Sequence, residues 1–372
     1  MRLSSTKFIC RAYSNLFCRA NVLTLQRSHP EDVAGLSLQA EQKNTRQRMS
    51  DLKNYSAASS GPDRSGDPVR PRPGRLRRFF GGRFKRIWIG ADGLRSGWAA
   101  LLFVMIVGGL IAGAAFIAHL LHHLPPRTTE IIPTKMLIGE IVMILAGLVA
   151  TKVMSLIDKR SWLDYGLRAP HRAAHLAQGL FFGVLAMSLM MATLRYFHAV
   201  TIEPSGMQLG PLIQSAAVWA ALFLLVGFNE ELSFRGYVFF RLLRGVGPVV
   251  ATLVTAAIFA LTHMGNPGET VYGIASVAAA GIVFCLAVWR TGSLWWIIGF
   301  HAAWDWSQSF VFGVADSGAM ASGHWLTSHT TGPAWLSGGA AGPEGSILML
   351  PMMAVLACVI VGTLPRNGAR RA

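Results

Sequence analysis

Three charged side chains interrupt an apolar stretch of the chain, at Glu230, Glu231 and Arg235 in the run VGFNEELSFRGYVFF. A charged side chain at the centre of a membrane helix costs on the order of 2.5 to 3.5 kcal/mol, so three of them need partners or a polar cavity. Glu231 and Arg235 are four positions apart on one helical face and can form an ion pair. Glu230 is rotated by about 100° from that face, so its carboxylate is available to face another group.

Two histidines in the following apolar segments offer partners for Glu230. His263 stands in IFALTHMG, four positions after Phe259, and His301 stands in WWIIGFHAAWDW, four positions before Asp305. In each pair the two residues share one face of a helix.

The depth of these groups along their helices predicts that they meet. If the chain turns between residues 245 and 248, Glu230 and His263 each lie roughly 21 Å from the turn, at 1.5 Å per residue. Asp305, counted from the start of its own segment, reaches the same level, and His301 lies about one turn nearer that start. The sequence therefore predicts that three helices bring one polar layer into an apolar interior.

These residue types suit hydrolysis. A desolvated carboxylate can take a proton from water, and neutral imidazoles can orient that water or stabilise an oxyanion. Glu230, His263 and His301 are also suitable ligands for a divalent metal such as zinc, although ligands so far apart in the sequence have no diagnostic spacing. A structural polar clamp between helices is the other explanation of the same residues. Their convergence on one layer favours chemistry.

The three short patterns resemble the CPBP family of membrane peptidases, which includes type II CAAX prenyl endopeptidases and bacterial relatives linked to bacteriocin processing and immunity. The family pattern is EE-x-x-x-R, then F-x-x-x-H, then H-x-x-x-N or a variant. The matching residues of this chain, in order, are Glu230, Glu231, Arg235, Phe259, His263, His301 and Asp305. The similarity extends over roughly residues 170–312.

The resemblance implies a role for each residue. Glu230 would activate the attacking water with help from His263, while His301 and the residue at 305 would stabilise the oxyanion. Asp305 departs from the pattern, because an asparagine there donates an N–H and an ionised aspartate only accepts hydrogen bonds. Asp305 must therefore be protonated, bind a metal or orient His301. Glu231 and Arg235 would support the site.

The elements that must position these residues are membrane helices. Apolar residues make up 52% of the 372 residues and charged residues only 14%, and each bilayer crossing needs roughly 20 apolar helical residues. The pattern predicts an all-α fold, a polytopic transmembrane helical bundle with about eight spans. Its hydrophobic segments cover about 98–122, 132–156, 173–197, 213–244, 249–267, 270–290, 293–314 and 345–364.

The N-terminal part of the chain has a different composition. Residues 1–96 contain 19 Lys and Arg against 7 Asp and Glu, and the segment is rich in Pro, Gly and Ser. We expect a disordered basic cytoplasmic tail over residues 1–90, with Met49 as a second candidate start, followed by a membrane domain over residues 91–372. The tail lacks a nucleic-acid recognition motif, so we expect contact with lipid headgroups and no nucleic-acid partner.

Basic loops set the expected orientation. Lys and Arg accumulate on the cytoplasmic side of short loops, which predicts an integral multi-pass protein of the cell (cytoplasmic) membrane with both termini in the cytoplasm. The expected partners are membrane lipid and a peptide or lipidated protein substrate.

The sequence therefore predicts an intramembrane endopeptidase that cleaves a membrane-associated substrate. Two other classes of protein fit the same polar layer: a non-catalytic membrane scaffold or bacteriocin-immunity-like protein, and a proton-coupled transporter that uses Glu230 and His263 as a relay. No inverted repeat or broken pair of helices supports the transporter.

Overall fold

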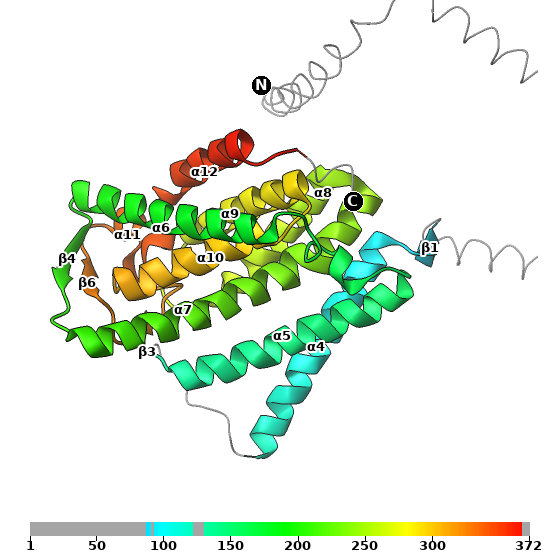
Figure 1. Cartoon of the computed structure of the whole chain (residues 1–372), viewed down its shortest axis with the longest axis horizontal. Coiled ribbons are helices and arrows are strands. Elements are labelled where there is room, and N and C mark those ends of the chain that lie inside the picture. The colour runs from blue at the N-terminus through cyan, green and yellow to red at the C-terminus, as the bar shows by residue number, and fades with distance from the viewer. Residues whose placement is uncertain (1–86, 91–92, 122–129, 367–372) are drawn as a thin grey trace, which may run out of the picture. The chain divides into compact units, whose positions relative to one another are not determined.

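A computed structural model describes residues 87–90, 93–121 and 130–366 of the chain (Figure 1). All eight predicted hydrophobic segments correspond to helices or pairs of helices. The long ones are α4 (Ser96–Leu120), α5 (Pro133–Ile157), α6 (Arg172–Tyr196), α7 (Leu209–Glu231), α8 (Tyr237–His263) and α9 (Val271–Thr291). Two shorter helices, α10 (Trp295–Trp306) and α12 (Met349–Thr363), complete the set. Of the predicted tail, only residues 87–90 fall within the described part.

Five helical stretches in this part of the chain are long and apolar enough to cross a membrane: Ser96–Leu120, Pro133–Ile157, Arg172–Tyr196, Leu209–His263 and Val271–Thr291. Large apolar side chains face outward on them, and Phe116, Ile138 and Phe181 are each more than 60% exposed. Such surfaces fit contact with lipid. The polytopic helical fold is confirmed, whereas the count of eight spans is not.

The stretch from Leu209 to His263 is interrupted twice. A π-helical turn, η2 (Leu232–Gly236), joins α7 to α8 directly after the two glutamates. Inside α8 the backbone leaves the helix at Gly247, where φ is 82°, and Pro248 follows. A left-handed φ favours glycine. Proline suits the first turn of a helix, because a backbone N–H at that position would have no acceptor within the helix. The predicted reversal between residues 245 and 248 is therefore confirmed.

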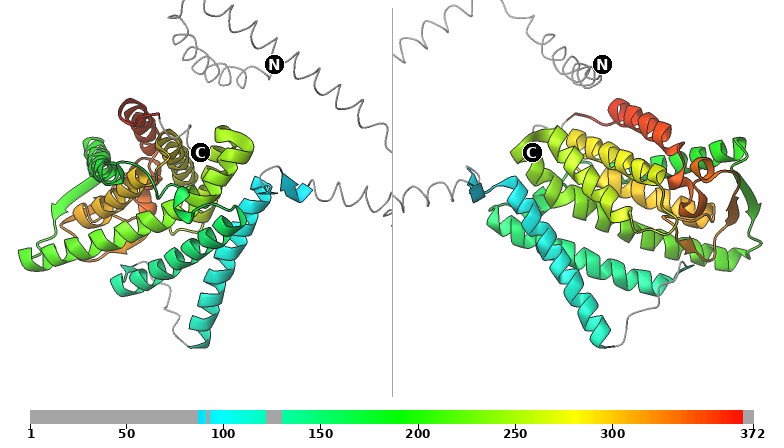
Figure 2. Two further views of the ribbon diagram at one scale, coloured as in Figure 1. Left: turned by 45° about the vertical axis from the view of Figure 1, so that its right-hand side comes forward. Right: turned by 180° about the vertical axis from the view of Figure 1, so that it is seen from behind.

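Helix α10, which carries His301, packs between α6 and α7 (Figures 1 and 2). The approach to α6 depends on Gly179 and Gly183, where an added Cβ would overlap the backbone of Trp296 and Phe300. On the other side, a Cβ at Gly227 of α7 would lie 2.9 Å from the carbonyl oxygen of Ile298. Small residues at four-residue spacing allow membrane helices to approach closely. These contacts fix the position of α10 between its neighbours.

Short strands supplement the helices. Strand β4 (Val200–Pro204) pairs antiparallel with β6 (Leu326–Thr330), and β3 (Glu130–Ile131) pairs parallel with β5 (Met320–Ala321). Both pairs use the connection between α10 and α12, which lies between the last two predicted hydrophobic segments. Strands β1 (Ile89–Gly90) and β2 (Gly93–Leu94) form a small hairpin before α4.

The connection after α10 begins with a π-helical turn, η3 (Ser307–Val311). It also contains the short helix α11 (Ala334–Ser337) and the 3-10 turns η4 (Gly339–Ala341) and η5 (Pro343–Gly345). A further 3-10 turn, η1 (Trp162–Asp164), lies elsewhere, between α5 and α6. The β-pairs hold this connection against the helices, so that it returns across the end of α10.

Candidate active site

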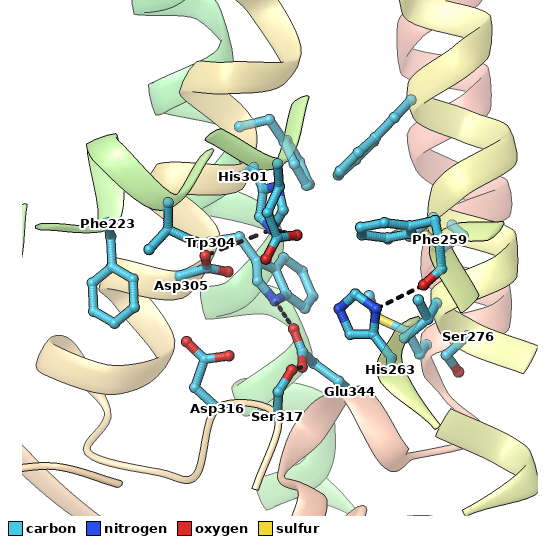
Figure 3. Close-up of a pocket in the computed structure, with 18 of the residues that line it drawn as sticks. Phe223, Phe259, His263, Ser276, His301, Trp304, Asp305, Asp316, Ser317 and Glu344 are labelled. Carbon is cyan, nitrogen blue, oxygen red and sulfur yellow. Dashed lines mark hydrogen bonds and ion pairs between the residues drawn. The ribbon is translucent and has the colours of Figure 1, made fainter. Parts of the chain in front are cut away.

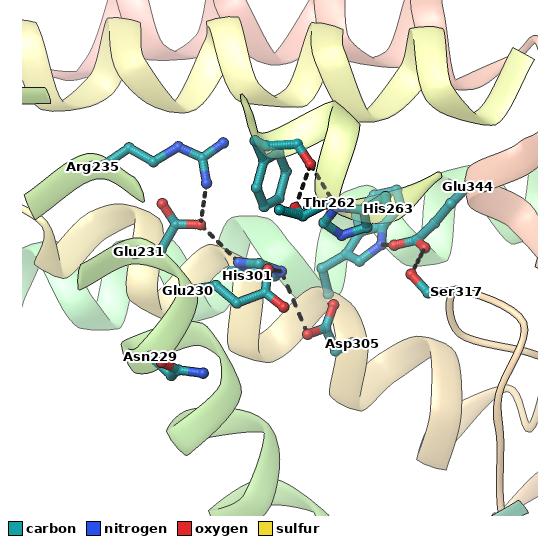
Figure 4. Close-up of polar contacts among 12 residues, drawn as sticks. Asn229, Glu230, Glu231, Arg235, Thr262, His263, His301, Asp305, Ser317 and Glu344 are labelled. Atoms are coloured by element: carbon teal, nitrogen blue, oxygen red, sulfur yellow. Dashed lines mark hydrogen bonds and ion pairs between the residues drawn. The ribbon is translucent and has the colours of Figure 1, made fainter. Parts of the chain in front are cut away.

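An ion pair buried between helices anchors the site. Arg235 Nη1 lies 3.3 Å from Glu231 Oε1, and both side chains are fully buried (Figure 4). The guanidinium carbon of Arg235 also lies 3.9 Å from the centroid of the Phe259 ring, which supplies a cation–π contact. The ion pair predicted from the four-residue spacing is confirmed, although it spans the π-helical turn η2 where the sequence suggests a continuous α-helix.

The same glutamate orients His301. His301 Nδ1 lies 2.8 Å from Glu231 Oε1. Because the carboxylate of Glu231 is paired with Arg235, it accepts this hydrogen bond and the Nδ1–H of His301 donates it. This hydrogen bond leaves Nε2 of His301 directed toward the opposite side of the ring.

Two further carboxyl groups face that second nitrogen. His301 Nε2 lies 3.8 Å from Glu230 Oε2 and 3.6 Å from Asp305 Oδ2. Oε2 of Glu230 is buried and accepts no hydrogen bond from the residues that the structure describes. His301 thus lies close to the carboxyl groups of Glu230, Glu231 and Asp305, although it precedes Asp305 by one turn of α10.

These groups border a cavity of about 220 Å³ (Figure 3). His263 lies on the wall opposite His301, and its Nδ1 is 2.8 Å from the carbonyl oxygen of Phe259. This bond turns the other ring nitrogen toward the cavity (Figure 3). Glu230, His263, His301 and Asp305 therefore line one space, as the depth argument predicts, but no hydrogen bond or ion pair joins Glu230 to His263 in the described structure.

Asp316 and Glu344, from the connection after α10, add two carboxyl groups that the sequence argument does not include. Oxygen atoms of Asp305, Asp316 and Glu344 all lie within 4.8 Å of one another. Burial raises the pKa of the Asp316 carboxyl well above its ordinary value, and the nearby carboxyl groups of Asp305 and Glu344 raise it further. Three negative charges this close repel one another, so the cluster favours binding of a proton or a cation.

Hydrogen bonds fix the positions of the two added acids. Glu344 accepts hydrogen bonds from Trp304 Nε1 at 3.1 Å and from Ser317 Oγ at 2.9 Å. Asp316 accepts one from Ser309 Oγ at 3.1 Å. Neither acid stands in a periodic apolar segment, so no local pattern in the sequence indicates that it enters the site.

Glu140 of α5 also borders the cavity and is absent from the sequence-based set. Its Oε2 accepts a hydrogen bond of 2.9 Å from Asn229 Nδ2, next to Glu230 in the chain. The sequence does contain a signal that indicates Glu140 as a site residue. Glu140 is an acidic residue in an apolar segment, and the energetic cost that singles out Glu230 applies to it equally.

The predicted metal ligands can be compared with this geometry. Glu230, His263 and His301 do not form a group whose ligand atoms all lie within 4.8 Å of one another in the part of the chain that the structure describes. Hydrogen bonds hold the two imidazoles on opposite walls of the cavity, which separates them. Among the residues that the structure describes, only Asp305, Asp316 and Glu344 have ligand atoms that all lie within 4.8 Å of one another. This all-oxygen set suits hard divalent cations better than zinc.

Comparison with known protein families supplies independent evidence. Residues 212–307 match the family described as type II CAAX prenyl endopeptidase Rce1-like. The match confirms the family resemblance. It extends over about a quarter of the chain and contains all three motifs, from Glu230 to Asp305. No curated protein matches the chain.

The Rce1-like segment and the site do not coincide fully. The segment includes α7, α8, α9 and α10, which carry the two motif histidines, the glutamate pair and Asp305. Glu140, Asp316 and Glu344 lie outside it. The family match supports a membrane protease in general, and it does not extend to the three additional acids.

Proposed function

We propose that the chain is an intramembrane endopeptidase that hydrolyses a peptide bond in a membrane-associated substrate, with Glu230 activating the water. One observation carries this proposal. The buried Oε2 of Glu230 lies 3.8 Å from His301 Nε2 at a cavity inside an apolar helical bundle, in a segment that matches a protease family. A carboxylate with no hydrogen-bond donor from the described protein groups is a strong acceptor for a water proton.

The chemistry follows from the positions of the side chains. Glu230 takes a proton as the water oxygen attacks the peptide carbonyl carbon, and His263 can hold the same water from the opposite wall. When the tetrahedral intermediate collapses, the C–N bond breaks and Glu230 returns the proton to the leaving amine. His301, held by Glu231, keeps its Nε2 directed at the reacting groups throughout.

Asp305 would contribute to stabilising the oxyanion. Because Asp316 and Glu344 lie so close, one proton shared within the cluster relieves their mutual repulsion. A protonated Asp305 offers an O–H where the family pattern has an asparagine N–H, and either group can donate to a developing oxyanion. A divalent cation bound by the same three acids would instead supply Lewis-acid stabilisation.

The cavity walls suggest the class of substrate. Ile131, Met136, Phe223 and Val226 line it beside the polar groups. An apolar or lipidated segment of a peptide fits such a wall, because apolar surface is removed from water on binding. A peptide or lipidated protein is therefore the proposed substrate.

Peptide cleavage by the purified protein tests the proposal. The assay would compare wild type with Glu230→Gln and His263→Ala on a panel of apolar and prenylated peptides, in detergent, with and without a chelator. Glu203→Gln is a matched control, because it is the same Glu-to-Gln change at an exposed position on β4, outside the cavity. We expect cleavage by wild type and the control, and loss of cleavage in both site variants.

Two further measurements on Glu230→Gln, thermal stability and cellular phenotype, separate the peptidase from a non-catalytic scaffold or immunity protein. The fully buried Glu231–Arg235 pair fits a scaffold role equally well, since it needs no chemistry. A scaffold predicts that Glu230→Gln lowers thermal stability but leaves the cellular phenotype unchanged at matched expression. Well-folded wild type that cleaves none of the peptides would reject the peptidase proposal for this panel's substrate class.

A further inference from the structure

A second cavity, of about 720 Å³, lies where α4 begins and α8 turns. It shares no lining residue with the cavity at Glu230. Three arginines line it, namely Arg95, Arg241 and Arg244, and no acidic residue is among its described lining residues. We call it the arginine cavity.

Arg241 is held rigidly at the base of the arginine cavity. Its Nε lies 3.6 Å from Asp158 Oδ1, its Nη2 donates a hydrogen bond to the carbonyl oxygen of Leu94, and its side chain is only 7% exposed. Asp158 also accepts hydrogen bonds from the hydroxyl groups of Tyr165, at 3.0 Å, and Tyr237, at 3.1 Å. The negative charge of Asp158 is therefore already shared among three donors.

The other two arginines are not matched by a carboxylate in this way. Arg244 is half-buried, with its Nε donating to the carbonyl oxygen of Phe240 at 3.2 Å and its guanidinium 5.4 Å from the centroid of the Tyr165 ring. The backbone and the ring orient this guanidinium without neutralising it. Arg95 is exposed at the entrance. The described residues that line the arginine cavity therefore carry a net positive charge.

The N-terminus of α4 adds backbone donors. Arg95 is its N-cap, in an extended conformation, and the Arg95 side chain makes no capping hydrogen bond. Ser96 and Gly97, the first two helical residues, line the cavity. The N–H groups of a first helical turn have no intrahelical acceptor, and together with the helix dipole they favour an anion.

The surroundings match the surface of a bilayer. Trp98 lines the cavity and stacks on Trp88, with ring centroids 4.1 Å apart, and tryptophan is enriched at membrane–water interfaces. Leu101 and Val246 also line it and are each more than 40% exposed. The cavity therefore offers apolar contacts beside its positive charge, as an amphipathic ligand requires.

We propose that the arginine cavity binds a phosphate group, supplied by the headgroup of an anionic phospholipid or by a soluble phosphate. Arginine donates two parallel hydrogen bonds to phosphate oxygens, and basic pockets between membrane helices recognise anionic headgroups in this manner. Arg241 provides a fixed contact, Arg244 an oriented one and Arg95 one at the entrance. The exposed apolar side chains favour the lipid as the source.

Lipid retention measured by native mass spectrometry tests this proposal. The full chain in detergent would be titrated with phosphatidylglycerol or with phosphatidylcholine. Wild type is compared with Arg95→Gln, with the double variant Arg95→Gln/Arg244→Gln, and with the control Arg172→Gln. Arg172 is exposed at the start of α6 and does not line the cavity. We expect wild type and the control to retain phosphatidylglycerol preferentially, and the double variant to bind it about tenfold or more weakly.

A competition arm identifies the source of the phosphate. Release of phosphatidylglycerol by millimolar inorganic phosphate would indicate a soluble ligand, and retention would indicate the lipid; both results support a phosphate site. Arg95→Gln alone should weaken binding in the same direction, and because Arg95 is exposed this variant keeps the test valid if the double variant does not fold. Equal retention of phosphatidylglycerol by the wild type and the folded arginine variants, or no preference over phosphatidylcholine, would overturn the proposal.

Discussion

One oxygen atom of Glu231 links His301 to the buried charge of Arg235. Oε1 of Glu231 lies 2.8 Å from His301 Nδ1 and 3.3 Å from Arg235 Nη1. The two donors share a single carboxylate oxygen of Glu231 and hold the imidazole in one orientation. The residue next to the proposed base therefore acts on the site through the histidine.

We expect Glu231→Gln to destabilise the protein strongly, because it leaves Arg235 buried without its counter-charge. Removing one partner of a buried ion pair costs about 3–5 kcal/mol. Replacing both residues, in Glu231→Leu/Arg235→Met, should restore most of the stability, since apolar residues of similar volume often substitute for such a pair. Thermal unfolding in detergent measures both effects.

The double variant also separates stability from catalysis. With Glu231 absent, His301 has no acceptor to fix its tautomer, so cleavage should stay well below that of wild type even where folding is restored. Removal of a carboxylate that orients a catalytic histidine costs roughly 10⁴-fold in rate. Recovery of cleavage together with stability would show that the pair is only a structural clamp.

Asp305→Asn should retain cleavage, because an amide N–H can donate where a protonated carboxyl does and the substitution removes one of three crowded carboxyl groups. Asp305→Ala, which has no donor, should lose it. Initial rates on one cleaved peptide, measured with and without a chelator, distinguish the two explanations of the cluster. Loss of activity in Asp305→Asn together with chelator sensitivity of the wild type would favour a bound cation.

Stability should depend on pH through Asp316. The folded-state pKa of this carboxyl is raised by burial and by the nearby Asp305 and Glu344. The folded protein therefore holds the proton more tightly than the unfolded chain. The stabilisation from this group is complete below about pH 4, the unfolded pKa, and is lost as the pH rises toward the folded-state pKa.

Asp316→Asn should accordingly flatten the decline in apparent melting temperature between pH 4 and neutral pH, and should be at least as stable as wild type at neutral pH. Glu203→Gln, exposed on β4, is the control and should follow wild type. Melting curves over this pH range decide the matter, and a steeper decline in Asp316→Asn than in wild type would contradict the expectation.

Close packing of α6 on α10 should make the site sensitive to one methyl group. In Gly183→Ala the new Cβ would overlap the carbonyl oxygen of Phe300 and lie 2.8 Å from the Cβ of Ala303. Overpacking of this kind costs about 1–3 kcal/mol, and displacement of α10 moves His301. We expect a lower melting temperature and reduced cleavage.

Gly113→Ala is the matched control for that substitution. Gly113 lies on an exposed face of α4, and an added Cβ there meets no atom within 4 Å. Alanine is the better helix former, so this variant should be as stable as wild type or slightly more stable. Equal effects of the two substitutions would show that the approach of α6 to α10 does not constrain the site.

The sequence by itself determined the helical membrane fold and the main polar groups. A charge in a membrane helix is costly wherever the helix lies, so Glu230, Glu231 and Arg235 can be recognised from their own segment alone. The four-residue spacing fixes which of them share a face, and the turn near Pro248 sets the depth of His263. These are local properties, and the structure agrees with them.

Only the tertiary structure decided how the site is completed. Asp316 and Glu344 reach Asp305 because β4 and β3 pair with strands of the connection after α10, and pairing between distant segments leaves no periodic pattern in either one. The choice of His301 as the shared partner of Glu231, Glu230 and Asp305 depends on the close approach of α10 to α6 and α7. Such contacts join residues that are remote in the chain. They depend on how several helices pack together, so no single segment of the sequence predicts them.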